Sequence, residues 1–348
     1  MNKEIKEILK ITNQFLKIPS VTSNEKPFLD YLNKKISKLK KYNIIQTDSY
    51  LLIKTKNNPN KTNKNKNKEN KYLFSIHIDR HGFAKNNNNE IEYQAYKRKK
   101  EEKLKFNRDT KEFFENCALR HTKENISSYN PKTGKIINKY ISNRNNLDWK
   151  NKLVTFTLNK DPKSNENIFM LNSQISITNN LFFAQIDNVI SAAVIFYLLK
   201  TSNFQDEIIF TTQEEIGLSY KCVLDYLDKN TTENTIKNQI ITLDTTPYEN
   251  FNNKEKGFIV LRKGDENGDF NLNLVKEFEK IANKNKIPIE YKASNNGMTE
   301  LGRISSTSKG KYNGATIQIP TTNYHTTYET STFENLENYL KIIKKIIN

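Results

Sequence analysis

The sequence predicts an α/β fold: a mainly parallel sheet with helices on both faces, interrupted by a smaller, β-rich inserted domain. Short apolar runs rich in β-branched and aromatic residues alternate with helical patterns, as in parallel sheets built from β-α-β units. Residues 84–178 break this alternation, because they are strongly charged and poor in glycine. We therefore expect a main domain from residues 1–83 and 179–348 and an inserted domain from residues 84–178.

The N-terminal part begins with two helices and continues into strands. Apolar side chains recur at helical spacing in residues 3–18 and again in residues 26–40. The pattern of residues 43–56 predicts two strands joined by a turn, and the apolar run 72–79 predicts a buried strand. The Lys- and Asn-rich tract 57–71 contains nothing to bury, so we expect a solvated loop there.

The inserted segment and the C-terminal part follow different patterns. Within the insertion we expect a helix near residues 109–119 and short strands such as residues 153–158. From residue 181 onwards, strands and helices alternate again. The expected strands cover residues 181–187, 207–215, 238–246, 287–293 and 315–321. The expected helices cover residues 188–202, 218–229, 273–286 and 332–347.

The composition excludes several classes of protein. The formal net charge is +17, but lysine and asparagine are abundant along the whole chain and basic residues do not interleave with aromatic ones. We therefore expect no nucleic-acid binding. The two cysteines, Cys117 and Cys222, are far apart in the sequence, which argues for a reducing compartment. No apolar run reaches the roughly 18 residues that cross a bilayer, so we expect a cytoplasmic protein without a membrane partner.

Candidate metal ligands follow the expected strands of the main domain. Each of five strands carries a histidine or an acidic residue at or just past its carboxyl end. The carboxyl ends of parallel strands meet at one edge of a sheet, where open α/β sheets place their sites. Imidazole and carboxylate groups are the ligands expected for Zn²⁺ and related ions. The residues are His77 with Asp79, Asp187, Glu214 with Glu215, Asp244, and His325.

This set of side chains matches the needs of a dinuclear hydrolase. Two ions about 3.5–4 Å apart can share one bridging carboxylate and take one histidine and one terminal carboxylate each. One carboxylate is then left over, and a spare carboxylate beside the bridging water acts as the general base. Glu214 and Glu215 fit this division, one as a ligand and the other as the base. Asp79 can accept the second ring N–H of His77 and so orient the ring.

Several short motifs of the main domain stand in a fixed order. They are "IPSVTSNE" (18–25), "HIDRHGF" (77–83), "DNVISAAV" (187–194), "QEEIGL" (213–218), "TLDTTP" (242–247), "NGMTELG" (296–302) and "PTTNYHTTYE" (320–329). In these motifs the chain resembles the tetrahedral (TET-type) zinc aminopeptidases, a family that includes glutamyl and leucyl aminopeptidases and proteins labelled endoglucanases. The long gap between Asp79 and Asp187 also favours this family over the carboxypeptidase-like zinc peptidases, whose insertion comes later in the chain.

The resemblance implies a zinc-peptidase α/β fold and an assignment of the metal ligands. His77, Asp187 and Asp244 would hold one ion, and Asp187, Glu215 and His325 would hold the other. Asp187 would therefore be the bridging carboxylate. The resemblance implies two divalent ions, with Zn²⁺ favoured and Co²⁺ or Mn²⁺ as alternatives.

The resemblance also implies catalytic roles and an assembly. Glu214 would be the general base, and Asp79 would orient His77. The insertion would be a small β-barrel that acts in dimerisation or as a lid and drives assembly into a dimer or a larger shell, up to a dodecamer. The substrates would be peptides.

The chain departs from the family at several positions. Arg80 stands where the family keeps an acid, so we expect a cation close to the metal pair. The segment 84–178 carries no motif of the family's insertion, and its charged, glycine-poor composition argues against the usual barrel. The other departures are Val189, Ser191, Glu300 and the pair Thr322-Asn323.

We expect no metal-binding or catalytic role for the remaining histidines, His81 and His121, or for Cys222. His81 matches no family role, so we expect a solvated side chain. His121 lies in the charged insertion, and we expect it at the surface. Cys222 lies on an apolar helix face, which is typical of core residues.

Together these features predict a dinuclear metallo-aminopeptidase that removes N-terminal residues from peptides, with a metal-bridging water activated by a glutamate. None of the inferred ligands is lost, which favours an active enzyme. Two alternatives remain open. One is a metalloamidase of the same fold, such as a deacylase, and the other is an inactive relative that serves as a structural subunit.

Overall fold

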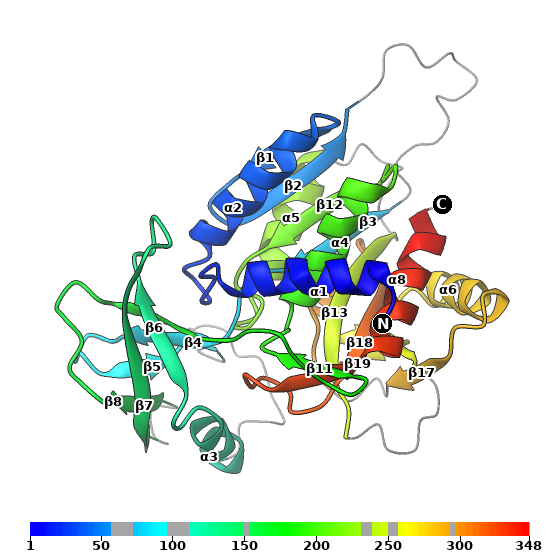
Figure 1. Cartoon of the computed structure of the whole chain (residues 1–348). Coiled ribbons are helices and arrows are strands. Elements are labelled where there is room, and N and C mark those ends of the chain that lie inside the picture. Colours follow the sequence, from blue (N-terminus) through cyan, green and yellow to red (C-terminus); the bar gives the residue numbers. More distant parts are fainter. Residues whose placement is uncertain are drawn as a thin grey trace.

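A computed structural model describes residues 1–56, 72–95, 111–148, 153–230, 239–249, 257–292 and 297–347. The expected loop at residues 57–71 lies outside these ranges. Within them, the chain forms one large mixed sheet with helices, a closed barrel and two small antiparallel sheets (Figure 1). No helix of the described residues combines the length and the apolar character that crossing a bilayer requires.

The large sheet has eight strands in the order β1-β2-β12-β3-β13-β18-β14-β17. Its central strands β12, β3, β13 and β18 run parallel to one another. The expected parallel character is thus confirmed for the centre, whereas β2 and β14 pair with it in the antiparallel direction. The strands are β1 (Tyr42–Gln46), β2 (Tyr50–Thr55), β3 (Leu73–His77), β12 (Glu207–Thr211), β13 (Ile240–Pro247), β14 (Ile259–Arg262), β17 (Ile289–Lys292) and β18 (Gly314–Thr321).

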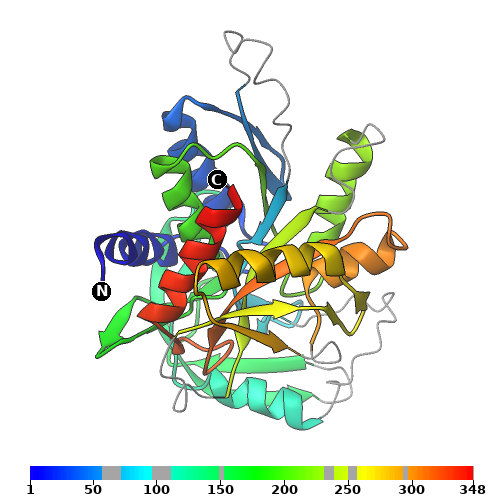
Figure 2. The same cartoon turned by 90° about the vertical axis from the view of Figure 1, so that its right-hand side faces the viewer.

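Helices cover both faces of this sheet. Apolar side chains of α1, α2, α4, α6 and α8 pack on one face, and those of α5 and α7 pack on the other. Figure 2 shows α6 and α8 on the same side of the sheet. Successive strand residues enter opposite cores, as Ile208 and Ile209 do, because side chains alternate along a strand. The helices are α1 (Lys3–Leu16), α2 (Lys26–Ile36), η1 (Ser37–Leu39), α4 (Val189–Thr201), α5 (Ser219–Asn230), α6 (Leu272–Lys284), α7 (Glu300–Thr307) and α8 (Phe333–Ile347).

Local sequence explains how several helices begin and what they bury. The side chain of Asn2 accepts the N–H of Ile5 and so caps α1. Helix α4 is buried from Val189 to Leu199, because α1 packs against it on the side away from the sheet. That burial explains why its sequence is apolar all round rather than on one face.

The inserted segment folds as a closed barrel in the strand order β4-β5-β8-β7-β6-β9, and the composition-based expectation against a barrel is wrong. Its interior is filled by widely spaced apolar residues such as Phe83, Phe156 and Phe169, while lysines such as Lys135 and Lys139 remain exposed. A high charge therefore does not prevent closure. The elements are β4 (Gly82–Lys85), β5 (Ile91–Tyr93), α3 (Lys111–Arg120), β6 (Asn125–Tyr129), β7 (Ile136–Asp148), β8 (Leu153–Leu158) and β9 (Ile168–Leu171).

Glycine is needed in this barrel where β4 starts. A Cβ atom at Gly82 would lie 2.8 Å from the carbonyl oxygen of Phe169, which belongs to the neighbouring strand β9. This close approach explains the glycine of the motif "HIDRHGF". Gly82 lies where the chain leaves the large sheet for the barrel.

The strand expected at residues 181–187 does not belong to the large sheet. It forms β11 (Leu181–Ala184), which pairs with β10 (Ser176–Thr178) and β19 (Glu329–Thr332) in a separate antiparallel sheet. Its half-buried alternation suits this small sheet, but a short apolar run does not reveal which sheet it joins. The remaining strands are β15 (Gly264–Asp265) and β16 (Gly268–Asp269).

Candidate metal centre

The predicted site residues come together at the carboxyl end of β3. His77 ends β3, Glu215 follows β12, and His325 follows β18. Asp244 lies inside β13 rather than past its end, because β13 continues to pair with β18 beyond the last residues that pair with β3. Asp187 comes from the small sheet, three residues after β11, so the idea that one sheet supplies every ligand is wrong.

The carboxylate of Asp187 lies between two histidines. Its Oδ1 is 3.3 Å from Nε2 of His77, and its Oδ2 is 3.3 Å from Nε2 of His325. Asp244 Oδ1 is also 3.3 Å from Nε2 of His77, and Glu215 Oε2 is 4.0 Å from Nε2 of His325. All five residues are less than one-tenth exposed, so the whole cluster is shielded from water.

This donor set fits divalent cations. The ligand atoms of His77, Asp187 and Glu215 lie within 4.8 Å of one another, and a second group of such atoms comprises His81, Glu215 and His325. Oε1 of Glu215 is buried and accepts no hydrogen bond from the described part of the chain. A buried carboxylate oxygen without a donor is costly unless it meets a cation. Nitrogen and oxygen donors in this mixture suit Zn²⁺, and they also accept Co²⁺ or Mn²⁺.

The electrostatics of the cluster also suit a bound cation. Burial raises the pKa of Glu215 well above its ordinary value, and the charge of Asp187 raises it further. Burial opposes the charged form of His77, but its hydrogen bonds to Asp187 and Asp244 outweigh burial and leave its pKa raised. A cation at this position would favour ionised carboxylates and neutral imidazoles, which are the forms that bind metals.

Asp79 is fully buried and holds the loop that carries the two glutamates. Its Oδ1 accepts the backbone N–H of Glu214 at 2.9 Å, and its Oδ2 accepts that of Glu215 at 3.0 Å and the hydroxyl of Thr22 at 3.0 Å. Its Oδ1 is 3.5 Å from Nδ1 of His77, on the ring side away from the other carboxylates. Asp79 therefore contacts more than the imidazole that the sequence assigned to it.

Glu214 is the half-buried acid of this loop. Burial raises its pKa to about 8, with Asp244 adding to the effect and the charges of His77 and Arg303 opposing it. A carboxyl group whose pKa lies near neutral pH can accept and return a proton, which is what a general base requires.

Glu329 is a further buried carboxylate that the sequence motifs contained but gave no role. Its Oε2 accepts the backbone N–H of Asp187 at 2.8 Å, and its Oε1 accepts that of His325 at 2.6 Å. One side chain on β19 thus fixes two candidate ligands from different segments. The only sequence signal for it is its place as the last residue of "PTTNYHTTYE".

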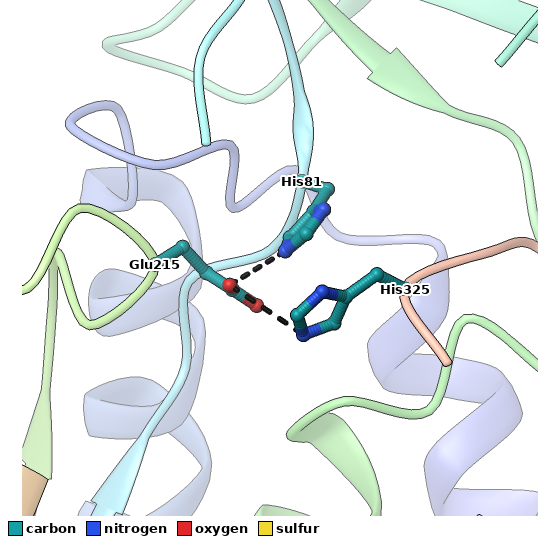
Figure 3. A group of neighbouring side chains, drawn as sticks. All are labelled: His81, Glu215 and His325. Atoms are coloured by element: carbon teal, nitrogen blue, oxygen red, sulfur yellow. Dashed lines mark hydrogen bonds and ion pairs between the residues drawn. The ribbon is translucent and has the colours of Figure 1, made fainter. Parts of the chain in front are cut away.

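His81 is buried in the centre, so the expectation of a solvated side chain is wrong. Its Nε2 is 2.5 Å from Oε2 of Glu215, and its ring faces His325 (Figure 3). The chain turns from the large sheet into the barrel between β3 and β4, which directs this side chain inwards. Burial lowers the pKa of His81 well below its ordinary value, helped by the nearby charge of His325.

His121 is also buried, contrary to the surface position expected for it. It follows α3, and its Nε2 lies 3.1 Å from the hydroxyl of Tyr93, which also hydrogen-bonds with Nδ1 of His81. Burial lowers the pKa of His121 to about 3. Its place inside the barrel depends on strand pairing that the charged sequence around it does not reveal.

The guanidinium group of Arg80 binds the end of α1. Its guanidinium group donates to the hydroxyl of Ser20 at 2.9 Å and to the carbonyls of Leu16 at 3.3 Å and Ile18 at 2.6 Å. These carbonyls lie at and just past the end of α1, where unpaired backbone acceptors need donors. The side chain of Arg80 therefore turns toward α1.

The other departures from the family pattern also have local partners. Glu300 accepts hydrogen bonds from Ser75 and Thr211 beneath the centre, and Ser191 contacts the hydroxyl of Tyr339 at 2.8 Å. Thr322 exchanges two backbone hydrogen bonds with Thr330. None of these contacts removes a candidate ligand from the cluster.

Comparisons with known proteins agree with this fold. Residues 164–342 match the family described as M42 glutamyl aminopeptidase. No curated protein matches the chain by sequence. Similar solved structures include an aminopeptidase from the archaeon Desulfurococcus kamchatkensis (TM-score 0.72, 13% identity, 99% of this chain and 95% of that one). Two others are a TET aminopeptidase from a marine sediment Thaumarchaeota archaeon (0.71, 12%, 98% and 96%) and the TET1 peptidase of Pyrococcus horikoshii (0.68, 15%, 99% and 99%).

Proposed function

This chain belongs to the M42 glutamyl aminopeptidase family and is a metallo-aminopeptidase, and from that premise we propose how its residues remove N-terminal residues from peptides. We propose that two divalent ions bind in the candidate centre. The family membership and the buried donor set support this reading together.

The position of Asp187 is the observation that carries the proposal. Its two oxygens each face a different histidine at 3.3 Å, which is how a carboxylate shared by two ions would have to lie. We assign His77 and Asp244 to one ion, Glu215 and His325 to the other, and Asp187 to both. Zn²⁺ is the favoured ion, since the donors are imidazole and carboxylate groups.

Glu214 is the proposed general base. When bound, the two ions would polarise the scissile carbonyl and acidify the attacking water. Glu214 accepts one proton from that water as the water oxygen attacks the carbonyl carbon. It returns the proton to the leaving nitrogen as the C–N bond breaks. Asp79 supports this step by holding the backbone of Glu214 and by orienting His77.

We propose that the protein self-associates through the inserted domain, residues 84–178. The TET1 peptidase of Pyrococcus horikoshii, which shares this fold, assembles into a tetrahedron or an octahedral shell. In this chain, exposed large apolar side chains within the inserted segment include Leu119, Ile136, Ile137 and Ile141. Exposed apolar side chains favour burial against a partner. A cytoplasmic location is part of the same proposal and rests on the cysteine usage.

Metal analysis combined with a substrate panel tests this function. The zinc-loaded protein should hydrolyse aminoacyl-p-nitroanilides, and a chelator should remove both the zinc and the activity. Hydrolysis of N-acyl substrates alone would instead identify a deacylase. A protein that holds zinc but cleaves neither class would be an inactive relative, and a protein without zinc would refute the proposal.

Substitution of the base gives the sharper test. Glu214→Gln should abolish turnover and leave both ions bound, because the amide cannot accept the proton and Glu214 is not assigned to either ion. Glu90→Gln, the same change on an exposed turn of the barrel, is the matched control and should behave as the unmodified protein. Full turnover by Glu214→Gln would refute its role.

A further inference from the structure

The Nε2 atom of His81 points at the carboxylate of Glu215, which together with His325 would bind the second ion. Its Nε2 is 2.5 Å from Oε2 of Glu215, and Nε2 of His325 is 4.0 Å from the same oxygen. The two imidazole rings are 4.2 Å apart between centroids, and both are buried (Figure 3). The ligand atoms of His81, Glu215 and His325 lie within 4.8 Å of one another, which is close enough to surround one ion.

The other ring nitrogen of His81, Nδ1, binds a side chain of the barrel. Its Nδ1 hydrogen-bonds with the hydroxyl of Tyr93 at the end of β5, and that hydroxyl also contacts Nε2 of His121 at 3.1 Å. When the phenol oxygen accepts the Nδ1–H of His81, its own O–H can donate to His121. The lone pair of His81 Nε2 then faces the second ion position.

His77 has a similar orientation, although its Nδ1 makes no hydrogen bond with the described residues. Its Nδ1 lies 3.5 Å from Asp79, while its Nε2 faces Asp187 and Asp244. Histidines that bind metals usually donate their other N–H to an oxygen, which fixes the tautomer and the ring orientation. His81 and His77 therefore share a geometry that suits ligands, although only His77 occupies a ligand position of the family pattern.

We propose that His81 is an additional ligand of the ion held by Asp187, Glu215 and His325. This inference rests on the proposed function, because it presupposes the two-ion centre. The second ion would then have four protein donors instead of three, and Zn²⁺ can still accept a fifth ligand during catalysis. Because Tyr93 belongs to the barrel, the inserted domain would also contribute to holding this ion.

Zinc affinity and X-ray absorption test this role without relying on activity. We compare His81→Gln with His121→Gln, which makes the same change at a buried histidine whose Nε2 contacts Tyr93. The glutamine side chain can still donate an N–H to Glu215, but it has no imidazole nitrogen to bind the ion. Apo protein is titrated with Zn²⁺ against a chromophoric chelator, and imidazoles per pair of ions are counted by X-ray absorption of the zinc-loaded protein.

We expect His81→Gln to weaken the second ion at least about 100-fold, since even the loss of an outer partner costs 10–100-fold. We also expect one imidazole fewer per pair of ions in His81→Gln, and an unchanged imidazole count in His121→Gln, which leaves the ring of His81 in place. Wild-type affinity in His81→Gln, or a wild-type count of only one imidazole per ion, would overturn the role of His81. The wild-type count decides the matter even when the variant does not fold, and a wild-type protein that binds no zinc would overturn the proposed function itself.

Discussion

Asp79 gives the most informative prediction, because its carboxylate accepts hydrogen bonds from the loop that carries both glutamates. Asp79→Asn replaces one carboxylate oxygen by an NH₂ group. If the NH₂ group takes the place of Oδ1, the backbone N–H of Glu214 loses its acceptor. If it takes the place of Oδ2, the backbone N–H of Glu215 and the hydroxyl of Thr22 lose their acceptor. Either orientation therefore breaks at least one hydrogen bond to a buried charge and leaves donors facing each other.

The cost follows from the number of bonds lost. One hydrogen bond to a charged group contributes about 1.5–3 kcal/mol. Since each 1.36 kcal/mol corresponds to a factor of ten in rate, we expect kcat/KM to fall about ten- to hundredfold if the loop position governs the general base. The second ion should also bind more weakly, because Glu215 lies on the same loop.

The assay measures kcat/KM on an aminoacyl-p-nitroanilide and the affinity of each ion by chelator competition. Thr22→Val is the control, since it removes one donor to Asp79 and leaves both backbone hydrogen bonds in place. We expect the control to lose stability alone, by about 1.5–3 kcal/mol. If Asp79→Asn weakens only the ion at His77 and leaves turnover at saturating zinc unchanged, Asp79 orients His77 alone and the reasoning about the loop is refuted.

Three further predictions follow from the same structure. Arg80→Met should lower the free energy of unfolding by about 1.5–3 kcal/mol in chemical denaturation and leave zinc affinity unchanged, since Arg80 binds the end of α1; weaker zinc binding would contradict this. Burial raises the pKa of Glu214 to about 8 in the metal-free protein, so zinc binding should release protons below that pH and zinc affinity should rise with pH until about 8. Calorimetry in buffers of different ionisation enthalpy measures this, and no proton release at pH 7 would argue against it. Leu119→Glu with Ile141→Glu should reduce the mass measured by light scattering, whereas Ile45→Glu, an equally exposed site on β1, should not.

The sequence alone determined the class of the fold and the chemical type of the site. Helical and strand patterns are local, so the central parallel strands and the helices α1, α2, α4, α5, α6 and α8 follow from residue spacing. Helix α7 was not expected from the sequence. The candidate ligands were recognisable because five strands in succession carry a histidine or an acid at or just past the carboxyl end. The placement of His77 beside Asp244 follows from the parallel pairing of β3 and β13.

Only the tertiary structure decided which segments carry the candidate ligands and which residues position them. The sheet that β11 joins, the closure of the barrel and the burial of His81 and His121 depend on pairing between distant segments. Glu329 is a similar case, since it binds two backbone N–H groups that only the fold brings together. A residue type shows what chemistry is available, whereas the direction of a side chain is set by neighbours far away in the sequence. Arg80 illustrates this, because its guanidinium group binds carbonyls at the end of α1.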